Sequence, residues 1–456
     1  MPYTNKNNPS IQEEDKKLVG IRAKVHALIR QYHQIKFDQT TVHAGVDMIE
    51  TSGKFVGAQE LINGTDAVLD GWWTDGRFAD TFSKLLRNYL DIKLCLLTNS
   101  GSSANLVAFF ALTSPLLGSR QIHAGDEVIT VAAAFPTTVN PIVQAGCIPV
   151  FVDIELSTLN INWKQLEKAL SPKTKAIMVA HTQGNPFNLD KVLAFARKHN
   201  LWLVEDSCDA LGAEYRGKKV GTFGDIATFS FYPAHQATMG EGGAVVTNNA
   251  LLFRIAKSFR DWGRDCWCET GEDNACRRRF SFQFNHLPFG YDHKFVYSHL
   301  GYNVKLTDMQ AAIGVAQIER IDSFIKARRD NYQNLLKLLS PYRAYFLFQE
   351  AEKESNPSWF GFMLTLTKKC PFTLTQLCIF LNDRKIATRP LYCGNITRQP
   401  FFEHIRYRTI GALPNSDYIM ERTFWVGVHP KLTKGHMKYM AETIGRFIEQ
   451  KLYEKK

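Results

Sequence analysis

Short apolar runs alternate with segments of helical spacing from about residue 90 onward. The runs are rich in β-branched residues and end at turn-forming residues. In chain order they read LCLLTNS, DEVITVAAA, CIPVFVDI, AIMVAHTQG, LWLVEDSC, DIATFSFY and GGAVVTNN. Because these runs lack a clean alternation of apolar and polar positions, they predict a mainly parallel sheet with helices on both faces. The predicted fold class is α/β.

The two ends of the chain have different patterns. Apolar residues with helical spacing near the start predict an amphipathic helix packed on the main body: Leu18, Ile21, Val25, Leu28 and Ile29. A helical stretch follows Thr307 and continues toward Leu339. Beyond it, WFGFMLTLT is typical of a strand and LTQLCIFLNDR of a helix, so the last part of the chain predicts a smaller α+β domain.

These patterns predict three parts. Residues 1–45 form an N-terminal helical extension, residues 46–340 a large domain and residues 341–456 a small C-terminal α+β domain. Within the large domain, residues 262–302 are rich in charge, aromatic side chains and glycine, and they are only weakly periodic. We expect this segment to be a long functional loop rather than part of the sheet.

Composition excludes several classes of protein. With 45% hydrophobic and 22% charged residues, the 456-residue chain is typical of a soluble globular protein. No apolar run approaches the roughly 18 residues of a membrane helix, and the polar start lacks a signal core, so we expect a cytoplasmic protein with no membrane association. The net charge of +11 comes from scattered residues without a nucleic-acid-binding module. An ordinary basic surface is therefore favoured over a nucleic-acid site, and the charge equally suits an anionic small substrate such as a nucleotide diphosphate.

Two features suit a phosphate. Gly101, Ser102 and Ser103 follow a predicted strand and open a helix, where backbone amides and hydroxyls bind anions. Ser230 ends a later strand and supplies another hydroxyl. Each feature alone is weak, because Gly-Ser-Ser is more often an ordinary helix start, so their order and spacing along the chain carry the argument.

Two further residues suit an aromatic cofactor. Phe135 follows a predicted strand, where its ring can stack on a pyridine ring. Asp206 closes the buried strand LWLVED, where a carboxylate can keep a pyridine nitrogen protonated. Taken singly, Phe135 reads as a core residue and Asp206 as a turn residue. Together with the phosphate features, they indicate a pyridoxal-phosphate (PLP) site.

His235 lies in SFYPAHQATMGEGG, at the position where a large group of PLP enzymes carries a lysine. That lysine forms a Schiff base with the cofactor aldehyde and moves protons. An imidazole moves protons but forms no such bond. We therefore expect a noncovalently held cofactor and a reaction other than ordinary transamination.

Six blocks in order resemble the DegT/DnrJ/EryC1/StrS sugar aminotransferase family, which uses nucleotide-linked 4-keto sugars: TNSGSSAN, AAAFPTT, EDSCDALGA, SFYPAH, GEGGAVVT and LGYNVKLTDMQAAIG. The resemblance runs from about Gly71 to Gln317. It implies an aspartate-aminotransferase-like (fold type I) PLP-dependent transferase fold. It also implies a homodimer, in which Asn303 reaches the partner's cofactor phosphate. Asp209 stands where the family commonly has glutamine, near the cofactor ring hydroxyl.

Histidine in place of the lysine resembles the 3-dehydratase branch of this family. The resemblance implies pyridoxamine phosphate (PMP) as cofactor and a nucleotide-linked 4-keto-6-deoxyhexose as substrate. His235 would act as the general base, Asp206 would keep the ring nitrogen protonated, and the sugar would lose its C3 hydroxyl.

Four of the nine cysteines have an unusual spacing. Cys208, Cys266, Cys268 and Cys276 lack the close pairs of a structural zinc site, and four thiolates suit a [2Fe–2S] cluster. Spacing alone leaves a metal centre and an incidental group of thiols equally open. The spacing also resembles the iron–sulfur motif of the 3-dehydratase branch, which implies a cluster near Asp206 and a separate NADH-dependent flavin iron–sulfur reductase.

Two alternatives stay open at this point. One is a cluster-free, PMP-dependent 3-dehydratase that completes its cycle with glutamate. The other is a pseudoenzyme that has lost its lysine and binds a sugar nucleotide. The resemblance favours CDP as the nucleotide of the substrate, with dTDP and GDP as alternatives.

Overall fold

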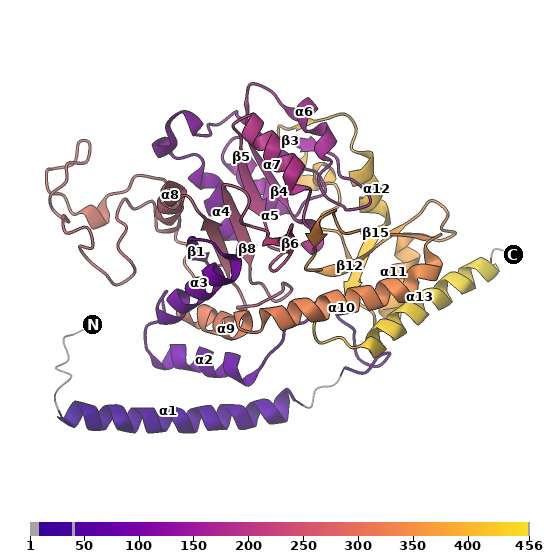
Figure 1. Cartoon of the computed structure of the whole chain (residues 1–456), viewed down its shortest axis with the longest axis horizontal. Coiled ribbons are helices and arrows are strands. Elements are labelled where there is room, and N and C mark those ends of the chain that lie inside the picture. Colours follow the sequence, from indigo (N-terminus) through magenta and orange to yellow (C-terminus); the bar gives the residue numbers. More distant parts are fainter. Residues whose placement is uncertain (1–8, 39–41, 455–456) are drawn as a thin grey trace.

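The computed structural model describes residues 9–38 and 42–454, and its largest feature is an eight-stranded sheet (Figure 1). The strands lie in the order β1-β9-β8-β5-β4-β2-β3-β14. Their bounds are β1 Leu94–Thr98, β2 Glu127–Val131, β3 Ile148–Val152, β4 Thr174–Ala180, β5 Trp202–Asp206, β8 Ile226–Ser230, β9 Gly243–Thr247 and β14 Arg408–Thr409. Only β9 runs antiparallel to its neighbours. The mainly parallel α/β fold is confirmed.

Helices cover both faces of this sheet, as its continuous apolar strands require. One face packs against α4 (Gly101–Ala111), α5 (Pro136–Gln144) and α8 (Ala250–Arg260). The opposite face packs against α7 (Leu189–Lys198), α3 (Arg77–Leu90) and α9 (Asp308–Ile318). The apolar runs therefore form a sheet buried between two helical layers.

A second, antiparallel sheet forms the C-terminal part and has the order β10-β12-β15-β13. Its strands are β10 Phe346–Phe348, β12 Gly361–Leu366, β13 Arg389–Pro390 and β15 Thr423–Gly427. It shares a hydrophobic core with α10 (Ile321–Leu339), α11 (Leu374–Asp383) and α13 (Lys434–Glu454). Because β14 leaves this part of the chain to pair with β3, the boundary at residue 341 stays a prediction.

The smaller elements connect these layers. Two are short helices, α6 Leu166–Ala169 and α12 Pro414–Arg422. Three strands form a short sheet: β6 Glu214–Tyr215, β7 Lys218–Lys219 and β11 Ser355–Asn356. The others are 3₁₀ turns: η1 Pro115–Arg120, η2 Trp163–Gln165, η3 Thr182–Gly184, η4 His293–Phe295, η5 Ser340–Tyr342, η6 Ile396–Arg398 and η7 Pro400–Phe402.

The N-terminal helix α1 (Pro9–Lys36) differs from the expectation. Its apolar residues Leu18, Ile21 and Leu28 are exposed rather than packed on the body. Its contacts with α2 (Ala58–Leu69) include polar ones: Arg22 bonds Asp66 and Asp70, and His26 Nε2 lies 2.9 Å from Asp66 Oδ1. Ion pairs therefore hold the helix against α2, while much of the apolar stripe faces outward.

The helix expected after Thr307 is also divided. It breaks into α9 and α10 at Arg320, which leaves helical geometry and pairs with buried Glu60 of α2. Residues 262–302, by contrast, form the expected long loop. The 3₁₀ turn η4 is its only regular helix or strand, and Figure 1 shows it projecting from the body beside α8.

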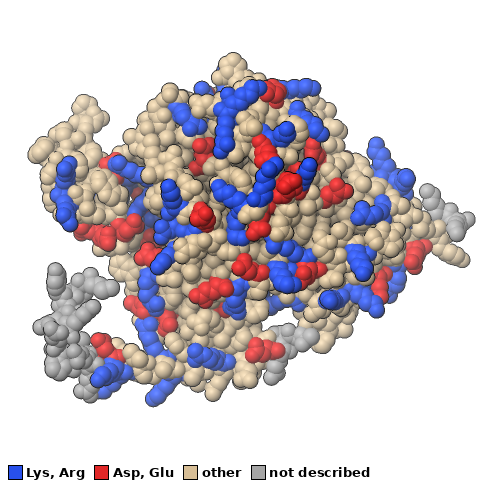
Figure 2. Space-filling view, in the orientation of Figure 1, with Lys and Arg blue, Asp and Glu red and all other residues tan. Residues whose placement is uncertain are grey.

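The surface carries intermixed charge. In Figure 2, lysine and arginine are spread over the visible face between aspartate and glutamate, without one continuous basic stripe. Within the described ranges, no helix has the length and apolar character needed to cross a membrane.

Candidate active site

A cavity of about 730 Å³ lies at the carboxyl ends of β1, β4, β5 and β8. In sheets of this kind ligands bind at this edge, because the loops that follow the strands converge there. The cavity wall includes eight residues predicted from the sequence: Gly101, Ser102, Phe135, Asp206, Cys208, Asp209, Ser230 and His235. The fold thus gathers most of the predicted site.

The start of α4, where the sequence predicts a phosphate site, lines the cavity. Ser100 caps the helix by accepting from the Ser103 amide at 3.1 Å, so the Ser103 N–H is already used. Ser103 does not line the cavity, whereas Ser100, which sequence analysis missed, does. A Cβ at Gly101 would lie 2.3 Å from the Ser230 Cβ, so only glycine lets the helix start pack against that strand end.

Asp206 is buried at the end of β5 and is held by three donors. Its Oδ2 accepts from Asn105 Nδ2 at 2.8 Å and from Thr138 Oγ1 at 2.7 Å. Its Oδ1 accepts from the Cys208 amide at 3.1 Å. These bonds fix the carboxylate at the cavity wall, as a partner for a pyridinium N–H requires. The ring of Phe135 is half exposed along the same wall.

His235 lies on the cavity wall beside Asp209. Its Nδ1 is 3.4 Å from Asp209 Oδ1, and its ring meets the Phe360 ring edge-on at a centroid distance of 5.3 Å. A carboxylate beside Nδ1 favours the tautomer that leaves Nε2 free to accept a proton. The arrangement suits a general base.

Arg328 holds the backbone around this histidine. The side chain is fully buried on α10 and donates to the carbonyls of His235 and Phe360 at 3.1 and 2.9 Å. Further bonds reach the carbonyls of Ala234 and Trp359. Burial lowers the pKa of Arg328 to about 10, so the guanidinium keeps its charge at neutral pH.

Tyr392 is a site residue that sequence analysis missed. Its hydroxyl donates to Asp209 Oδ2 at 2.6 Å and accepts from the Gln183 amide at 3.2 Å. Burial and the adjacent Asp209 raise the pKa of Tyr392 well above its usual value, so the phenol keeps its proton. Tyr392 comes from the C-terminal part, where the family resemblance is loose, and its segment LYCGN carries no cofactor signature.

Asn303 lies apart from the cavity of its own chain. It is exposed beside the projecting loop, and its Oδ1 accepts from Lys305 Nζ at 2.9 Å. One chain therefore does not place Asn303 at the cofactor, and its predicted role across a dimer stays a prediction.

The four predicted cluster cysteines are divided within one chain. Cys208 lines the cavity, whereas Cys266, Cys268 and Cys276 lie in the projecting loop. Across residues 9–38 and 42–454, no three histidine, cysteine, aspartate or glutamate side chains are placed to hold one metal ion. Burial raises the pKa of the Cys208 thiol well above its usual value, and Asp206 adds to this effect. The four thiols of a single chain thus do not fit one [2Fe–2S] cluster.

The chain was compared with known proteins. Residues 56–445 match the DegT/DnrJ/EryC1/StrS aminotransferase family. The protein belongs to this family. The lipopolysaccharide biosynthesis protein RfbH of Salmonella typhimurium is 51% identical to it, covering 94% of this chain and 98% of the relative. The dTDP-4-dehydro-2,6-dideoxy-D-glucose 3-dehydratase of Saccharopolyspora spinosa is 47% identical, covering 93% and 92%.

Solved structures agree with this assignment. The GDP-4-keto-6-deoxy-D-mannose-3-dehydratase of E. coli, solved with bound hydrated PLP, has a TM-score of 0.78 and 26% identity. The match covers 89% of this chain and all of that one. The chain therefore has the aspartate-aminotransferase-like fold of PLP-dependent sugar-modifying enzymes, as the sequence blocks predicted.

Proposed function

We propose that the protein is a PMP-dependent C3 dehydratase of a nucleotide-linked 4-keto-6-deoxyhexose, with CDP-4-keto-6-deoxy-D-glucose as the favoured substrate. The observation that carries the proposal is His235 at the lysine position, on the wall of a cavity that keeps the other cofactor features. The names of the two sequence relatives, a lipopolysaccharide biosynthesis protein and a sugar 3-dehydratase, support the substrate class. The specific choice of CDP rests on the resemblance of the sequence to CDP-4-keto-6-deoxy-D-glucose 3-dehydrase.

The residues present fit PMP. The α4 start, Ser102 and Ser230 would hold the phosphate, Asp206 would bind the ring N–H, and the cavity volume suits a cofactor together with a sugar. The bound cofactor would supply an amine that joins the sugar at C4 and a conjugated ring that withdraws electrons. No lysine lines this cavity among the described residues, so the cofactor would stay noncovalently bound.

His235 would move the proton that starts the reaction. Its Nε2 would remove a proton from the C4′ carbon of the cofactor, while Asp209 stabilises the imidazolium from the Nδ1 side. Tyr392 would fix Asp209 in that position through its 2.6 Å hydrogen bond. Asp206 would hold the proton on the ring nitrogen, and the sugar would lose its C3 hydroxyl.

The proposal has three finer parts: a [2Fe–2S] cluster, an NADH-dependent flavin iron–sulfur reductase and a homodimer. The cysteine pattern supports the cluster, and a cluster that passes single electrons supports the reductase. Exposed Asn303 supports the dimer, since an amide beside the projecting loop is available to a second subunit. The product would be a 4-keto-3,6-dideoxy sugar.

A cluster-free dehydratase that uses glutamate is the second candidate. The separation of Cys208 from the loop cysteines favours it. A similar solved structure also favours this candidate. It is a GDP-4-keto-6-deoxymannose-3-dehydratase with a trapped PLP-glutamate geminal diamine, 28% identical to this chain with a TM-score of 0.76. A pseudoenzyme is less favoured, because the phosphate cradle, Asp206 and a proton-transfer residue are all present.

An anaerobic assay separates these functions. The protein is treated with iron and sulfide, loaded with PMP and given CDP-, dTDP- or GDP-linked 4-keto-6-deoxyhexose. The proposal predicts cluster absorbance and an EPR signal after reduction, with a dideoxy product that requires a reductase. Turnover by iron-free protein with glutamate alone would establish the second candidate. Nucleotide-sugar binding without solvent-hydrogen exchange into PMP would indicate the pseudoenzyme.

A further inference from the structure

Arg389 is the only lysine or arginine that lines the cavity of about 730 Å³ among the described residues. The same wall carries four carboxylate side chains: Glu50, Asp206, Asp209 and Glu241. A ligand with several negative charges is repelled by carboxylates and attracted by a guanidinium. Within the described wall, Arg389 is therefore the place where such a ligand gains a charged partner.

The side chain of Arg389 is available to a ligand. It is exposed, and Nη1 donates to the carbonyl oxygen of neighbouring Thr388 at 2.9 Å. Across residues 9–38 and 42–454, no aspartate or glutamate forms an ion pair with it. Most of the N–H donors of the guanidinium are therefore free.

Strand pairing turns Arg389 toward the cavity. In the antiparallel pair of β13 and β15, Arg389 lies directly opposite Trp425. Side chains of directly opposed residues lie on the same face of a sheet. Trp425 lines the cavity, whereas the preceding Phe424 packs into the core of the second sheet. The indole Nε1 of Trp425 also donates to the Pro390 carbonyl at 3.0 Å, which holds the two strands together.

Two aromatic contacts connect this strand pair to His235. The Trp425 ring meets the Phe360 ring at a centroid distance of 5.4 Å, and the Phe360 ring meets that of His235 at 5.3 Å. In a nucleotide-linked sugar the diphosphate is joined to C1, across the sugar ring from C4, the carbon that would react beside His235. A side chain that binds the diphosphate must therefore lie on the cavity wall away from His235, as Arg389 does.

Other elements build the place proposed for the cofactor phosphate. Gly101 and Ser102 start α4, and Ser230 ends β8 of the large sheet, whereas Arg389 comes from the second sheet. The helix start offers amides and hydroxyls without a cationic side chain. A cation on the other sheet suits a second anionic group, which a cofactor and a nucleotide-linked sugar bound together would bring.

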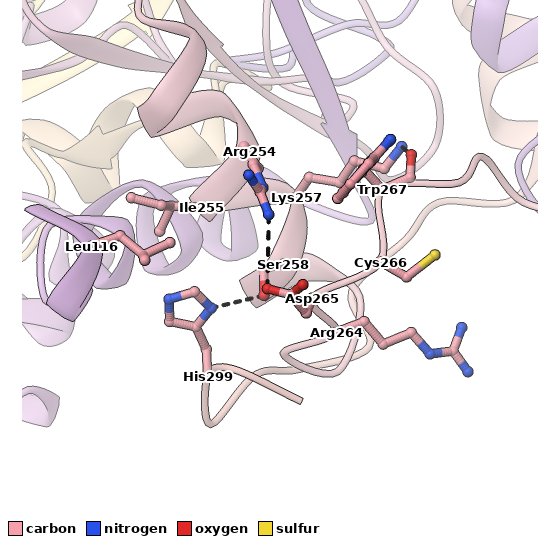
Figure 3. Close-up of a pocket in the computed structure, with 10 residues that line it drawn as sticks. All are labelled: Leu116, Arg254, Ile255, Lys257, Ser258, Arg264, Asp265, Cys266, Trp267 and His299. Atoms are coloured by element: carbon pink, nitrogen blue, oxygen red, sulfur yellow. Dashed lines mark hydrogen bonds and ion pairs between the residues drawn. The ribbon is translucent and has the colours of Figure 1, made fainter. Parts of the chain in front are cut away.

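Basic residues at the base of the projecting loop are a contrasting case (Figure 3). Arg254 pairs with Asp265 at 3.8 Å, and Lys257 pairs with Glu269 at 2.5 Å. The cavity that they border has a volume of about 10 Å³, enough for about one water molecule. Because these cations already have carboxylate partners and the cavity is so small, this pocket does not suit a diphosphate.

We infer that Arg389 binds the diphosphate of the nucleotide-linked substrate and thereby selects nucleoside diphosphates over nucleosides. The planar guanidinium can donate two parallel N–H groups to phosphate oxygens. The inference rests on the proposed function, because it requires a substrate that carries a diphosphate. The contact does not involve the base, so it is the same for CDP, dTDP and GDP.

Binding of nucleoside diphosphates tests the inference. CDP, dTDP and GDP, each beside its nucleoside, are titrated by calorimetry into PMP-loaded wild type and R389M. Wild type should bind at least one diphosphate more tightly than the matching nucleoside. R389M should bind that diphosphate at least about tenfold more weakly, because a hydrogen-bonded charge pair is lost. Its affinities for the nucleoside and for PMP should not change, and an unchanged urea midpoint checks the fold.

R398M is the matched control. Arg398 also belongs to the C-terminal part, but it pairs with Asp417 and Glu421 and does not line the cavity, so diphosphate affinity should stay at the wild-type value. Equal diphosphate affinity of R389M and wild type would overturn the inference. Weaker PMP binding by folded R389M would also overturn it, because Arg389 would then hold the cofactor phosphate. Wild type that binds none of the three diphosphates would instead refute the nucleotide-linked substrate of the proposed function.

Discussion

Gly101 couples the start of α4 to the end of β8. A Cβ added at this position would lie 2.3 Å from the Ser230 Cβ and 3.0 Å from its Cα, so helix and strand would have to separate. The same two residues line the cavity, at the place proposed to hold the cofactor phosphate. The packing of α4 against β8, and with it the proposed phosphate site, therefore depends on the absence of a Cβ at Gly101.

G101A should weaken PMP binding about tenfold, because overpacking of this contact costs on the order of 1–3 kcal/mol and displaces the helix start. Fluorescence titration with PMP measures the effect. G64A is the matched control, since a Cβ on Gly64 of α2 would meet only Ile313, at 3.9 Å, and should leave PMP affinity unchanged. Equal affinity of G101A and wild type would show that this helix start does not hold the phosphate.

The residues of the site differ in how far the sequence determines them. His235, Asp206 and Gly101 lie in blocks whose order matches a family, so their positions at the cavity could be predicted. Ser100 was missed because the block offers four adjacent serine and glycine residues, 100–103, and the sequence does not show which of them line the cavity. Tyr392 was missed because no periodicity encodes a contact with Asp209, 183 positions away.

At the scale of elements, α10 connects the large sheet to the C-terminal sheet. Its Arg328 bonds four carbonyls, two in the His235 turn and two preceding β12. None of these hydrogen-bond acceptors is a carboxylate, so backbone dipoles stabilise the buried charge together with the nearby carboxylate of Asp209. The helix thereby sets the position of His235 relative to Phe360.

R328M should lower the free energy of unfolding by about 3 kcal/mol, because it leaves several buried carbonyls without donors. Urea unfolding followed by circular dichroism measures the loss. On the same helix, K326A removes an exposed pair with Asp330 and should change stability by less than about 0.5 kcal/mol. A similar decrease in the free energy of unfolding in R328M and K326A would show that Arg328 does not stabilise the fold through its buried hydrogen bonds.

His429 joins the segment before α2 to the end of β15. Its Nε2 lies 3.2 Å from the Glu50 carbonyl, and burial, with nearby Arg328, lowers its pKa to about 3. In the unfolded chain the imidazole gains a proton below about pH 6.5, whereas in the folded protein it stays neutral. Stability from this group is therefore present above pH 6.5 and is lost as the pH falls toward 3.

Between pH 7 and pH 5, protonation of His429 in the unfolded chain should lower the free energy of unfolding by about 2 kcal/mol. H429Q keeps a donor for the Glu50 carbonyl but has no titrating side chain at this position. Its free energy of unfolding should therefore fall by about 2 kcal/mol less than that of wild type between pH 7 and pH 5. Urea midpoints at the two pH values give the comparison. An identical pH dependence in wild type and H429Q would show that His429 already carries a proton in the folded protein.

At the scale of the whole molecule, the cavity combines two parts of the chain. The strand ends of the large sheet supply Asp206 and His235, while the C-terminal part supplies Phe360, Tyr392 and Trp425. Local apolar patterns predicted seven strands of the large sheet and β12 of the second sheet, because burial controls those patterns. They did not predict how the sheets meet, the outward-facing stripe of α1 or the division of the four cysteines, which depend on contacts between distant segments.

Loss of the C3 oxygen tests the central claim most directly. The PMP-loaded protein is given CDP-4-keto-6-deoxy-D-glucose labelled with oxygen-18 at the C3 hydroxyl, and mass spectrometry follows the label without reductase or glutamate. Wild type should release the label to water, and H235N, which keeps the PMP site, should do so at least about a hundredfold more slowly. Retention of the label by wild type with bound PMP and substrate, or equal release by H235N, would contradict dehydration with His235 as the base.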